Sequence, residues 1–311
     1  MTEIEKFKFK KYFDIEPALL HSLFEENLSS EYGNNPVNML DFVIENNSNK
    51  SFIEILKKSK NYFVNSMEIF KSKDFYDNDK LIGKKYLEIK NKTKSILEKY
   101  NDINLLIENT FTKNNQEFYF TSGWSSYGRG HAISSYYNKL NDNYYEFLLF
   151  NSGGGVEKYH NYDNKSDKYQ VILRTELSKN DMLDLFKELT IISHLDKTDE
   201  LSFYNLIKKY FTINENGIIK SIINEEIRGI TMQKAQISGS CTYMSQMYFK
   251  LYYLYKINKN YELYNEEQII IKSKGIDILK QILKEGTIKN QHKNLIDLLK
   301  NKIIKKKNID K

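Results

Sequence analysis

Strand-like alternation of apolar and polar residues is confined to residues 116–177 of this 311-residue chain. Apolar side chains recur at helical spacing before that stretch and again after it. The strongest strand candidate is YYEFLLF at residues 144–150, which follows the turn residues LNDN at 140–143. Strands joined by so short a turn pair antiparallel. The pattern therefore predicts an α+β fold that contains an antiparallel sheet.

The same pattern divides the chain into three regions. The first, residues 1–112, is predicted to be helical. The second, residues 113–257, combines the strands with a helical insertion at about 178–232. It ends in a long apolar run, residues 241–257, that is typical of a buried helix. The third, residues 258–311, is predicted to form C-terminal helices.

The net charge and the lengths of the apolar runs limit the classes of partner that the chain is expected to bind. Lys and Arg number 47 against 41 Asp and Glu, so 47 − 41 leaves a formal charge of +6. No basic motif typical of nucleic-acid binding accompanies the Lys-rich residues 301–311. Apolar runs such as residues 147–150 are far shorter than the roughly 20 residues that span a bilayer. We therefore expect neither nucleic-acid binding nor stable membrane insertion.

The first residues and the cysteine content indicate a reducing compartment. Residues 1–12 alternate Lys with Phe and lack the apolar core of a secretory leader, so we expect a cytoplasmic protein, with a leaderless export route left open. Cys241 is the only cysteine, which excludes an intrachain disulfide and any zinc site built on two thiolates. No group of His, Asp and Glu residues has metal-ligand spacing. We expect neither a metal nor a cofactor.

His131 and Asn151 are predicted to meet across a hairpin. If the turn is centred near residue 141, antiparallel partners sum to about 282, and 131 + 151 = 282. Directly opposed residues have Cβ atoms roughly 4.5 to 5.5 Å apart. An imidazole needs a second polar group to fix its tautomer, and an Asn carbonyl serves that purpose. A slip of one residue in the register would remove the contact.

Cys241 lies at the start of the apolar run, directly after the segment Gln236-Ile-Ser-Gly239-Ser. At the start of a helix, unpaired backbone N–H groups and the helix dipole favour the thiolate. Gly239 lets the backbone approach a substrate carbonyl closely. The Gln236 side chain is a candidate oxyanion donor together with the Cys241 N–H, and Gln233 is the alternative amide.

Two glycine-rich loops lie close to these residues in the sequence. Trp124 precedes His131 in the first loop, where it forms either one wall of a substrate cleft or part of the core. Gly153 and Gly154 follow Asn151 in a turn that we expect to face the substrate, because glycine lets a peptide backbone lie close. This turn lacks the Lys-Ser/Thr of a P-loop and the spaced glycines of a dinucleotide fingerprint. Nucleotide binding is therefore not expected.

Other assignments of these residue types stay open. His160 is a rival base, and a lone cysteine such as Cys241 can be a small buried hydrophobe. The remaining histidines lie in helical or polar stretches and are expected to be structural or solvated: His21, His194 and His292.

The segment QxxGSCxY at residues 236–243 resembles the glutamine and cysteine segment of papain-like cysteine proteases. The order along the chain, histidine first and cysteine last, is similar to that of ubiquitin-like-protein proteases and bacterial-effector cysteine proteases. The likeness covers roughly residues 120–255. It implies a papain-like core, an antiparallel sheet plus a catalytic helix, between helical N-terminal and C-terminal regions. It also implies the roles of the matching residues: His131 as base, Asn151 as its orienter, Gln236 as oxyanion donor and Cys241 as nucleophile.

The function that the resemblance implies is a thiol-dependent protease or isopeptidase. Its partner would be a protein or peptide substrate, cleaved at a peptide or ubiquitin-like-protein bond. Effector acetyltransferases resemble these proteases in catalytic order but pass an acyl group to a different acceptor, so acyl transfer is an alternative. A non-catalytic helical protein-binding module, with Cys241 as a core residue, is another. If the chain is an effector, we expect it to be delivered into a host cell.

Overall fold

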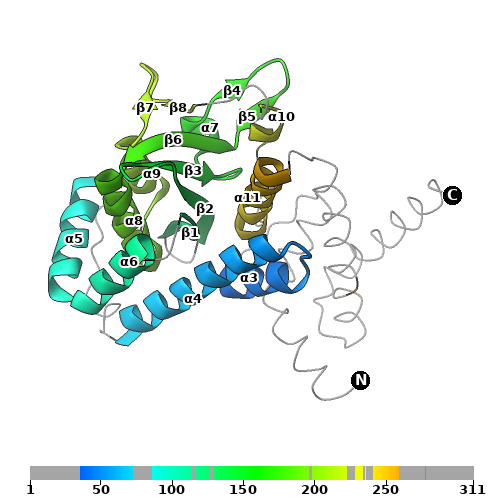
Figure 1. Cartoon of the computed structure of the whole chain (residues 1–311). Helices are drawn as coiled ribbons and strands as arrows, with labels where there is room; N and C mark the ends of the chain where they lie inside the picture. The colour runs from blue at the N-terminus through cyan, green and yellow to red at the C-terminus, as the bar shows by residue number, and fades with distance from the viewer. Residues whose placement is uncertain are drawn as a thin grey trace, which may run out of the picture.

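The computed structural model joins helices to one four-stranded antiparallel sheet (Figure 1). This arrangement confirms the predicted α+β class. The structure describes the following residues: 36–72, 86–113, 116–126, 129–195, 198–222, 228–233, 235, 241–258 and 277.

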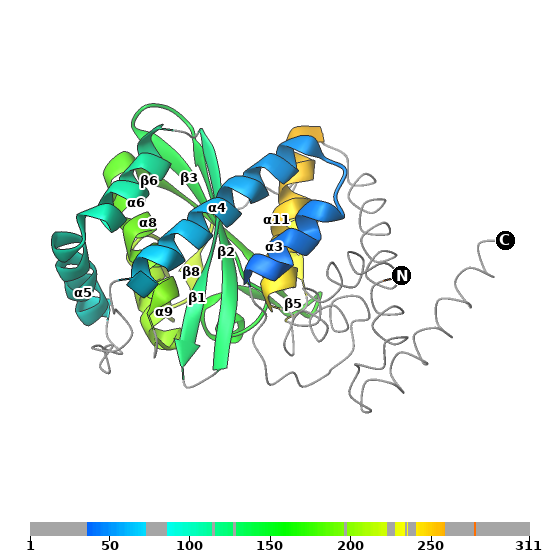
Figure 2. The same cartoon turned by 90° about the horizontal axis from the view of Figure 1, so that it is seen from below.

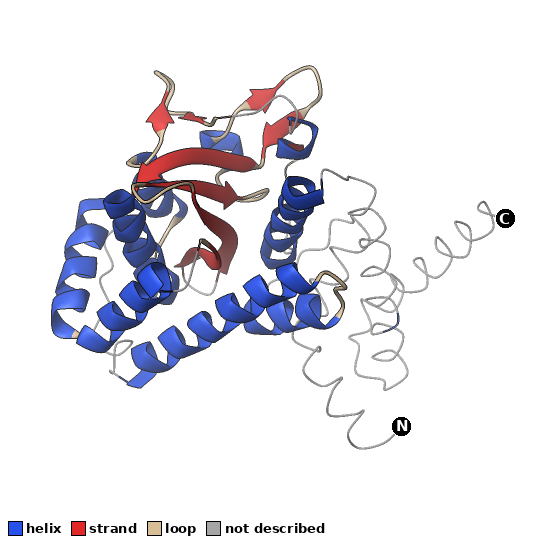
Figure 3. Cartoon of the chain, viewed as in Figure 1, coloured by secondary structure: helices blue, strands red, loops and turns tan. Residues whose placement is uncertain are grey.

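Helices make up most of the described chain on either side of the strands (Figure 3). Those before the first strand are α3 (Pro36–Glu45), α4 (Lys50–Ser72), α5 (Tyr86–Lys99) and α6 (Asn101–Lys113). Those after the third strand are α7 (Val156–Tyr159), α8 (Lys179–His194), α9 (Glu200–Lys208), α10 (Arg228–Thr231) and α11 (Cys241–Asn258).

The strands form one main sheet and two small ones. The main sheet has the order β1-β2-β3-β6 and is antiparallel throughout, with β1 (Glu117–Ser126), β2 (Arg129–Lys139), β3 (Tyr144–Phe150) and β6 (Ile172–Ser178). A second sheet joins β4 (Tyr162–Asp163), β5 (Lys168–Gln170) and β9 (Met232–Gln233). A third pairs β7 (Thr212–Ile213) with β8 (Ile219–Lys220).

Several predicted elements are confirmed. The described part of residues 1–112 is helical, the strand expected at 144–150 is β3, and the long apolar run is helix α11. Residues 178–232, predicted to be a helical insertion, contain α8 and α9 but also the β7–β8 hairpin. The predicted C-terminal helices, at residues 258–311, lie outside the described residues except for 258 and 277. None of the described helices is long and apolar enough to cross a membrane.

The β7–β8 hairpin is explained by its turn residues. The Asn214 carbonyl oxygen Oδ1 accepts from the backbone N–H groups of Asn216 and Ile218, at 3.0 and 2.8 Å. Gly217 then adopts a φ of 78°, which glycine reaches without steric cost. This local turn chemistry interrupts the helical pattern between α9 and α10.

The register of the β2–β3 hairpin differs from the predicted one. Ser134 pairs with Phe150, so partners sum to 134 + 150 = 284 and not to 282. The cause is Asn141, whose Oδ1 accepts from the backbone N–H groups of Asn143 and Tyr144, at 2.9 and 3.0 Å. This side-chain turn moves the centre of the hairpin one residue along the chain. Because partner positions shift by two, each side chain stays on its predicted face.

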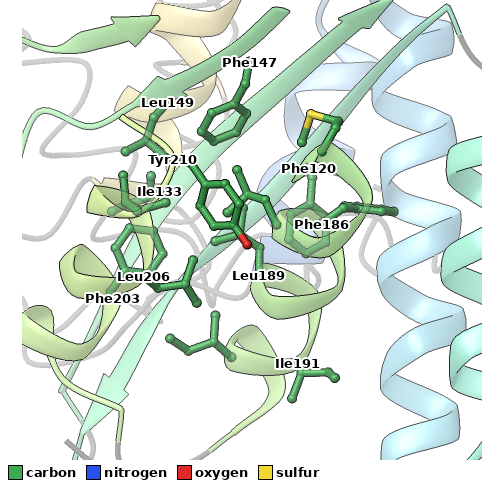
Figure 4. Packing of buried hydrophobic residues seen from close by; sticks show 14 of the residues in the cluster. Phe120, Ile133, Phe147, Leu149, Phe186, Leu189, Ile191, Phe203, Leu206 and Tyr210 are labelled. Carbon is green, nitrogen blue, oxygen red and sulfur yellow. The ribbon is translucent and has the colours of Figure 1, made fainter. Parts of the chain in front are cut away.

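Alternate residues of the main sheet are buried on opposite faces, under different helices. Phe120, Ile133 and Phe147 belong to one cluster with Phe186 and Leu189 of α8 (Figure 4). On the other face, Phe249 of α11 packs on three aromatic rings of the sheet, with ring centroids 4.4 to 5.6 Å apart: Tyr119, Tyr136 and Phe150. The two apolar faces therefore fix α8 and α11 on opposite sides of the same strands.

Helix α4 joins these two layers. It packs against β1, which is an edge strand of the main sheet (Figure 2). Near its start, Phe52 contacts Phe249 of α11 with ring centroids 5.4 Å apart. Farther along the same helix, Tyr62 contacts Phe186 of α8, with ring centroids 5.3 Å apart. The helix thus covers a sheet edge that would otherwise expose unpaired backbone groups.

His194, the last residue of α8, packs against α4. Its Nε2 lies 2.8 Å from Ser66 Oγ, and its ring stacks on Phe70 with centroids 4.6 Å apart. The side chain is 5% exposed, and burial lowers the pKa of His194 to about 4. The described contacts support the structural role expected for it.

Mild acid should destabilise the fold in part through His194. The unfolded imidazole binds a proton near pH 6.5, whereas the folded one does so only near pH 4. This contribution to stability is therefore full above pH 6.5 and falls as the pH drops toward 4. Between pH 6 and pH 5 the wild type should lose about 1 kcal/mol more unfolding free energy than His194→Gln. Urea unfolding at the two pH values measures this, and equal losses in both proteins would contradict it.

Candidate active site

His131 and Asn151 are in contact at one end of the main sheet. His131 lies in β2, Asn151 directly follows β3, and the His131 Nε2 to Asn151 Oδ1 distance is 2.7 Å. The predicted contact is confirmed, although the pairing from which it was inferred is wrong. Extending the observed register, 131 + 153 = 284, places Gly153 opposite the histidine and Asn151 on the diagonal. A diagonal neighbour on the same face lies within reach of an imidazole.

Four hydrogen bonds fix the orientation of the Asn151 amide. Its Oδ1 accepts from the Gly153 N–H at 2.9 Å as well as from His131. Its Nδ2 donates to the Gly154 carbonyl at 2.8 Å and to Tyr204 Oη at 2.6 Å. An amide oxygen only accepts, so His131 Nε2 must carry the proton that it donates to Asn151. The other ring nitrogen, Nδ1, is thereby left for a second partner.

That second partner is Cys241, the first residue of α11. The Cys241 side chain lies near enough to His131 to raise the pKa of the imidazole, through hydrogen bonding and through its negative charge. The backbone N–H of Ala132, the next residue in β2, donates to Cys241 Sγ at 3.3 Å. A hydrogen bond to the charged form of a group favours that form, so the Ala132 N–H supports a thiolate.

Opposing effects set the protonation of His131. Burial alone would lower its pKa. The hydrogen bond and negative charge of Cys241, the hydrogen bond to Asn151 and the charge of Glu200 act in the other direction, and the pKa of His131 is raised overall. Glu200 begins α9 and forms an ion pair with Lys158 at 2.7 Å. The surroundings therefore favour an imidazolium beside a cysteine thiolate.

Polar contacts hold α11 in register with the sheet. Near its start, Ser134 Oγ of β2 donates to Ser245 Oγ at 2.9 Å, one helical turn after Cys241. Toward its end, Tyr252 Oη donates to Glu146 Oε1 of β3 at 3.3 Å. Both serines are at most 1% exposed. Water does not compete for the buried contact between Ser134 and Ser245. This contact therefore fixes the position of Cys241 along β2.

Trp124 packs beside His131. The two rings have centroids 4.8 Å apart with an interplanar angle of 40°. The indole also contacts Phe203, with ring centroids 5.4 Å apart, and packs against the main core cluster. These contacts support the core role considered for Trp124, and its part in a substrate cleft stays a prediction. A Cβ on Gly154, which is exposed, would lie 3.0 Å from the indole edge.

Some of the remaining predicted residues lie outside the part of the chain that the structure describes. Gln236 and Gly239 lie outside the described residues, so their roles stay predictions. Gln233 lies in β9, where its Nε2 donates to the Ile230 carbonyl at 3.4 Å. His160 is 2% exposed, and both of its ring nitrogens are engaged, with the Gln170 carbonyl at 2.6 Å and with Tyr204 Oη at 2.8 Å. His160 therefore has no ring nitrogen available to take a proton from Cys241.

Two parts of the site were not predicted. The Ala132 N–H is a backbone group, and no residue pattern marks it. Tyr204 lies 53 residues beyond Asn151, in a helix whose apolar spacing reads as ordinary core. Among the described residues, no three His, Cys, Asp or Glu side chains gather as metal ligands would.

Comparison with known proteins adds no family assignment. No protein-family model matches the sequence, and no curated protein is significantly similar to it. The chemistry of the site must therefore be inferred from its geometry.

Gly153→Ala should disturb the His131 ring directly. An added Cβ would lie 2.3 Å from His131 Cε1, closer than real Cβ contacts allow, so the imidazole must move. Moving it away from Cys241 and Asn151 removes the contacts that raise the pKa of His131. The Hε1 proton of His131, followed by NMR against pH, should then titrate at lower pH than in the wild type.

Gly154→Ala is the matched control for this experiment. Its Cβ meets the Trp124 ring and not the imidazole, so the His131 titration should stay near that of the wild type. An unchanged titration in Gly153→Ala would contradict the placement of His131 over this turn.

Proposed function

We propose that this chain is a thiol-dependent hydrolase, a cysteine protease or isopeptidase, with Cys241 as nucleophile, His131 as base and Asn151 as its orienter. The observation that carries the proposal is the position of His131 between the other two residues: its Nε2 bonds Asn151 Oδ1, and the N–H of Ala132, the next residue, donates to Cys241 Sγ at 3.3 Å. A nucleophile, a base and a group that orients the base are the parts that nucleophilic catalysis needs.

The reaction follows from this arrangement. His131 Nδ1 takes the thiol proton, and Cys241 Sγ attacks the carbonyl carbon of the scissile amide. The imidazolium then gives the proton to the leaving nitrogen as the C–N bond breaks, which leaves an acyl-thioester and a free amine. Water attacks the thioester, passes a proton to His131, and releases the carboxylic acid while the Cys241 thiolate re-forms. Asn151 keeps the imidazole aligned through both steps.

The negative oxygen of the tetrahedral intermediates needs donors near Cys241. The Cys241 backbone N–H is proposed as one, because it lies at the N-terminal end of an 18-residue helix, where the helix dipole favours negative charge. Gln236 is proposed as the second donor on the strength of the sequence pattern.

Two features support a papain-like core for this site. Cys241 is the first residue of a long helix, and that helix packs on an antiparallel sheet whose second strand carries His131. The resemblance has departures, since Ala132 stands where an aromatic residue usually follows the histidine of ubiquitin-like-protein proteases. The Gln236 to Cys241 spacing is five residues where six is usual. The proposal therefore rests on the contacts of His131 more than on the motif.

The substrate is proposed to be a peptide or a ubiquitin-like-protein conjugate that lies along Gly153 and Gly154. Gly154 is exposed and Gly153 is half-buried, and the turn that they form adjoins both His131 and Trp124. A backbone without side chains at these positions leaves room for an extended peptide.

Turnover of a proteome-derived peptide library, read by mass spectrometry as new N-termini, tests the proposal. Cys241→Ala should reduce cleavage at least a thousandfold, because no other described group replaces the nucleophile. His131→Ala should reduce it at least a hundredfold through loss of the base.

His194→Gln is the control, since it changes a buried imidazole whose described contacts are with Ser66 and Phe70 of α4. It should cleave at the wild-type rate below the temperature at which it unfolds. Full cleavage by Cys241→Ala would contradict the proposed function.

A further inference from the structure

Tyr204 and His160 extend the polar contacts of Asn151 away from the proposed catalytic pair. Tyr204 Oη of α9 lies 2.6 Å from Asn151 Nδ2 and 2.8 Å from His160 Nε2. His160 Nδ1 lies 2.6 Å from the Gln170 carbonyl oxygen. All three side chains are buried, with exposed fractions of 0% for Tyr204, 1% for Asn151 and 2% for His160.

Donors and acceptors along these contacts have a single consistent direction. The Gln170 carbonyl only accepts, so His160 Nδ1 carries a proton and donates it. In a neutral imidazole, Nε2 then accepts, which requires the Tyr204 hydroxyl to donate to it. The Tyr204 oxygen in turn accepts from Asn151 Nδ2. Asn151 Oδ1 is thereby turned toward His131 Nε2.

Burial keeps this chain of hydrogen bonds uncharged. It lowers the pKa of His160 to about 4, so the imidazole is neutral near neutral pH. Burial also raises the pKa of Tyr204. A neutral His160 is the form that the donor and acceptor directions require.

Packing holds the Tyr204 ring in place. Tyr159 stacks on it with ring centroids 4.1 Å apart and an interplanar angle of 26°. On the side of the turn, Gly155 has a φ of 83°, and a Cβ there would lie 2.2 Å from Tyr204 Cε2. Only a glycine fits this close approach, so the hydroxyl has little freedom to move away from Asn151.

The two backbone contacts of the Asn151 amide cannot provide the same support. Gly153 and Gly154 belong to the turn that carries Asn151, so they move with it. Tyr204 lies on α9, and Gln170, the end of the chain of hydrogen bonds, lies on β5. Both elements also have contacts outside the turn, since α9 packs against β1 and α8 and β5 pairs with β9.

We propose that Tyr204 and His160 are positioning residues, which hold the Asn151 amide so that its oxygen orients His131 toward Cys241. This inference rests on the proposed function. The pair does not touch Cys241, and it acts only through Asn151 and His131.

Tyr204→Phe tests the proposal, with Tyr159→Phe as the matched control. Tyr204→Phe removes the hydroxyl that takes part in the chain of hydrogen bonds. Tyr159→Phe removes a hydroxyl from the ring that stacks on it. Iodoacetamide labels the single thiol, so intact mass reports Cys241 alone. Tyr204→Phe should label roughly five to ten times more slowly than the wild type at pH 6, with its pH profile shifted upward, because the thiolate loses an aligned imidazolium. Tyr159→Phe should retain the wild-type profile.

Substitution of His160 adds a rescue. His160→Gln keeps one donor and one acceptor in a neutral side chain and should label within about twofold of the wild type. His160→Leu removes both and should behave as Tyr204→Phe does. A merely structural role would lower the unfolding midpoint of these variants without moving the pH profile of labelling.

The outcomes separate this inference from the proposed function. A wild-type thiol that labels as slowly as a free cysteine would overturn both. A reactive wild-type thiol with an unchanged Tyr204→Phe profile would overturn the positioning role alone. Nitrogen-15 NMR of the wild type tests the direction of these hydrogen bonds even if a variant does not fold. His160 should be a neutral Nδ1–H tautomer at pH 6, and an ordinary titration near pH 6.5 would contradict the chain.

Discussion

The hydrogen bond from His131 Nε2 to Asn151 Oδ1, at 2.7 Å, determines what the rest of the site can do. It assigns the proton to Nε2 and so directs Nδ1 toward Cys241, the first residue of α11. The bond joins parts of the chain that are otherwise separate: strand β2, the turn after β3 and, through Tyr204, helix α9. A change in any of these would alter the direction of the imidazole.

The sheet is what brings these parts together. Its two apolar faces place α8 on one side and α11 on the other, and the Phe249 ring against Tyr136 fixes α11 beside β2. Once α11 is seated, the contact of Ser245 with Ser134 sets the height of the thiol, and the Ala132 N–H meets the sulfur. The stability of the fold and the geometry of the site thus depend on the same packing.

Residue patterns predicted the local elements better than their long-range contacts. The alternation in YYEFLLF and the apolar run after Cys241 suffice to place β3 and α11. The hairpin register was missed because the side chain of Asn141 shifts the turn by one residue, an effect that periodicity does not contain. The predicted contact between His131 and Asn151 is still present, because a shift of two residues in the pairing keeps both side chains on the same face. Tyr204 could not be predicted, since its apolar neighbours mark it only as core and its partner is 53 residues away.

The pH dependence of iodoacetamide labelling in the wild type and in His131→Ala tests the central claim most directly. Cys241 is the only thiol, so the mass of the intact chain reports it without interference. The geometry predicts fast labelling in the wild type with an apparent pKa well below about 8.5, and an upward shift when the imidazole is removed. Slow labelling that His131→Ala leaves unchanged would contradict a thiolate and imidazolium pair. Cys241 would then be a core residue of a protein that works by binding.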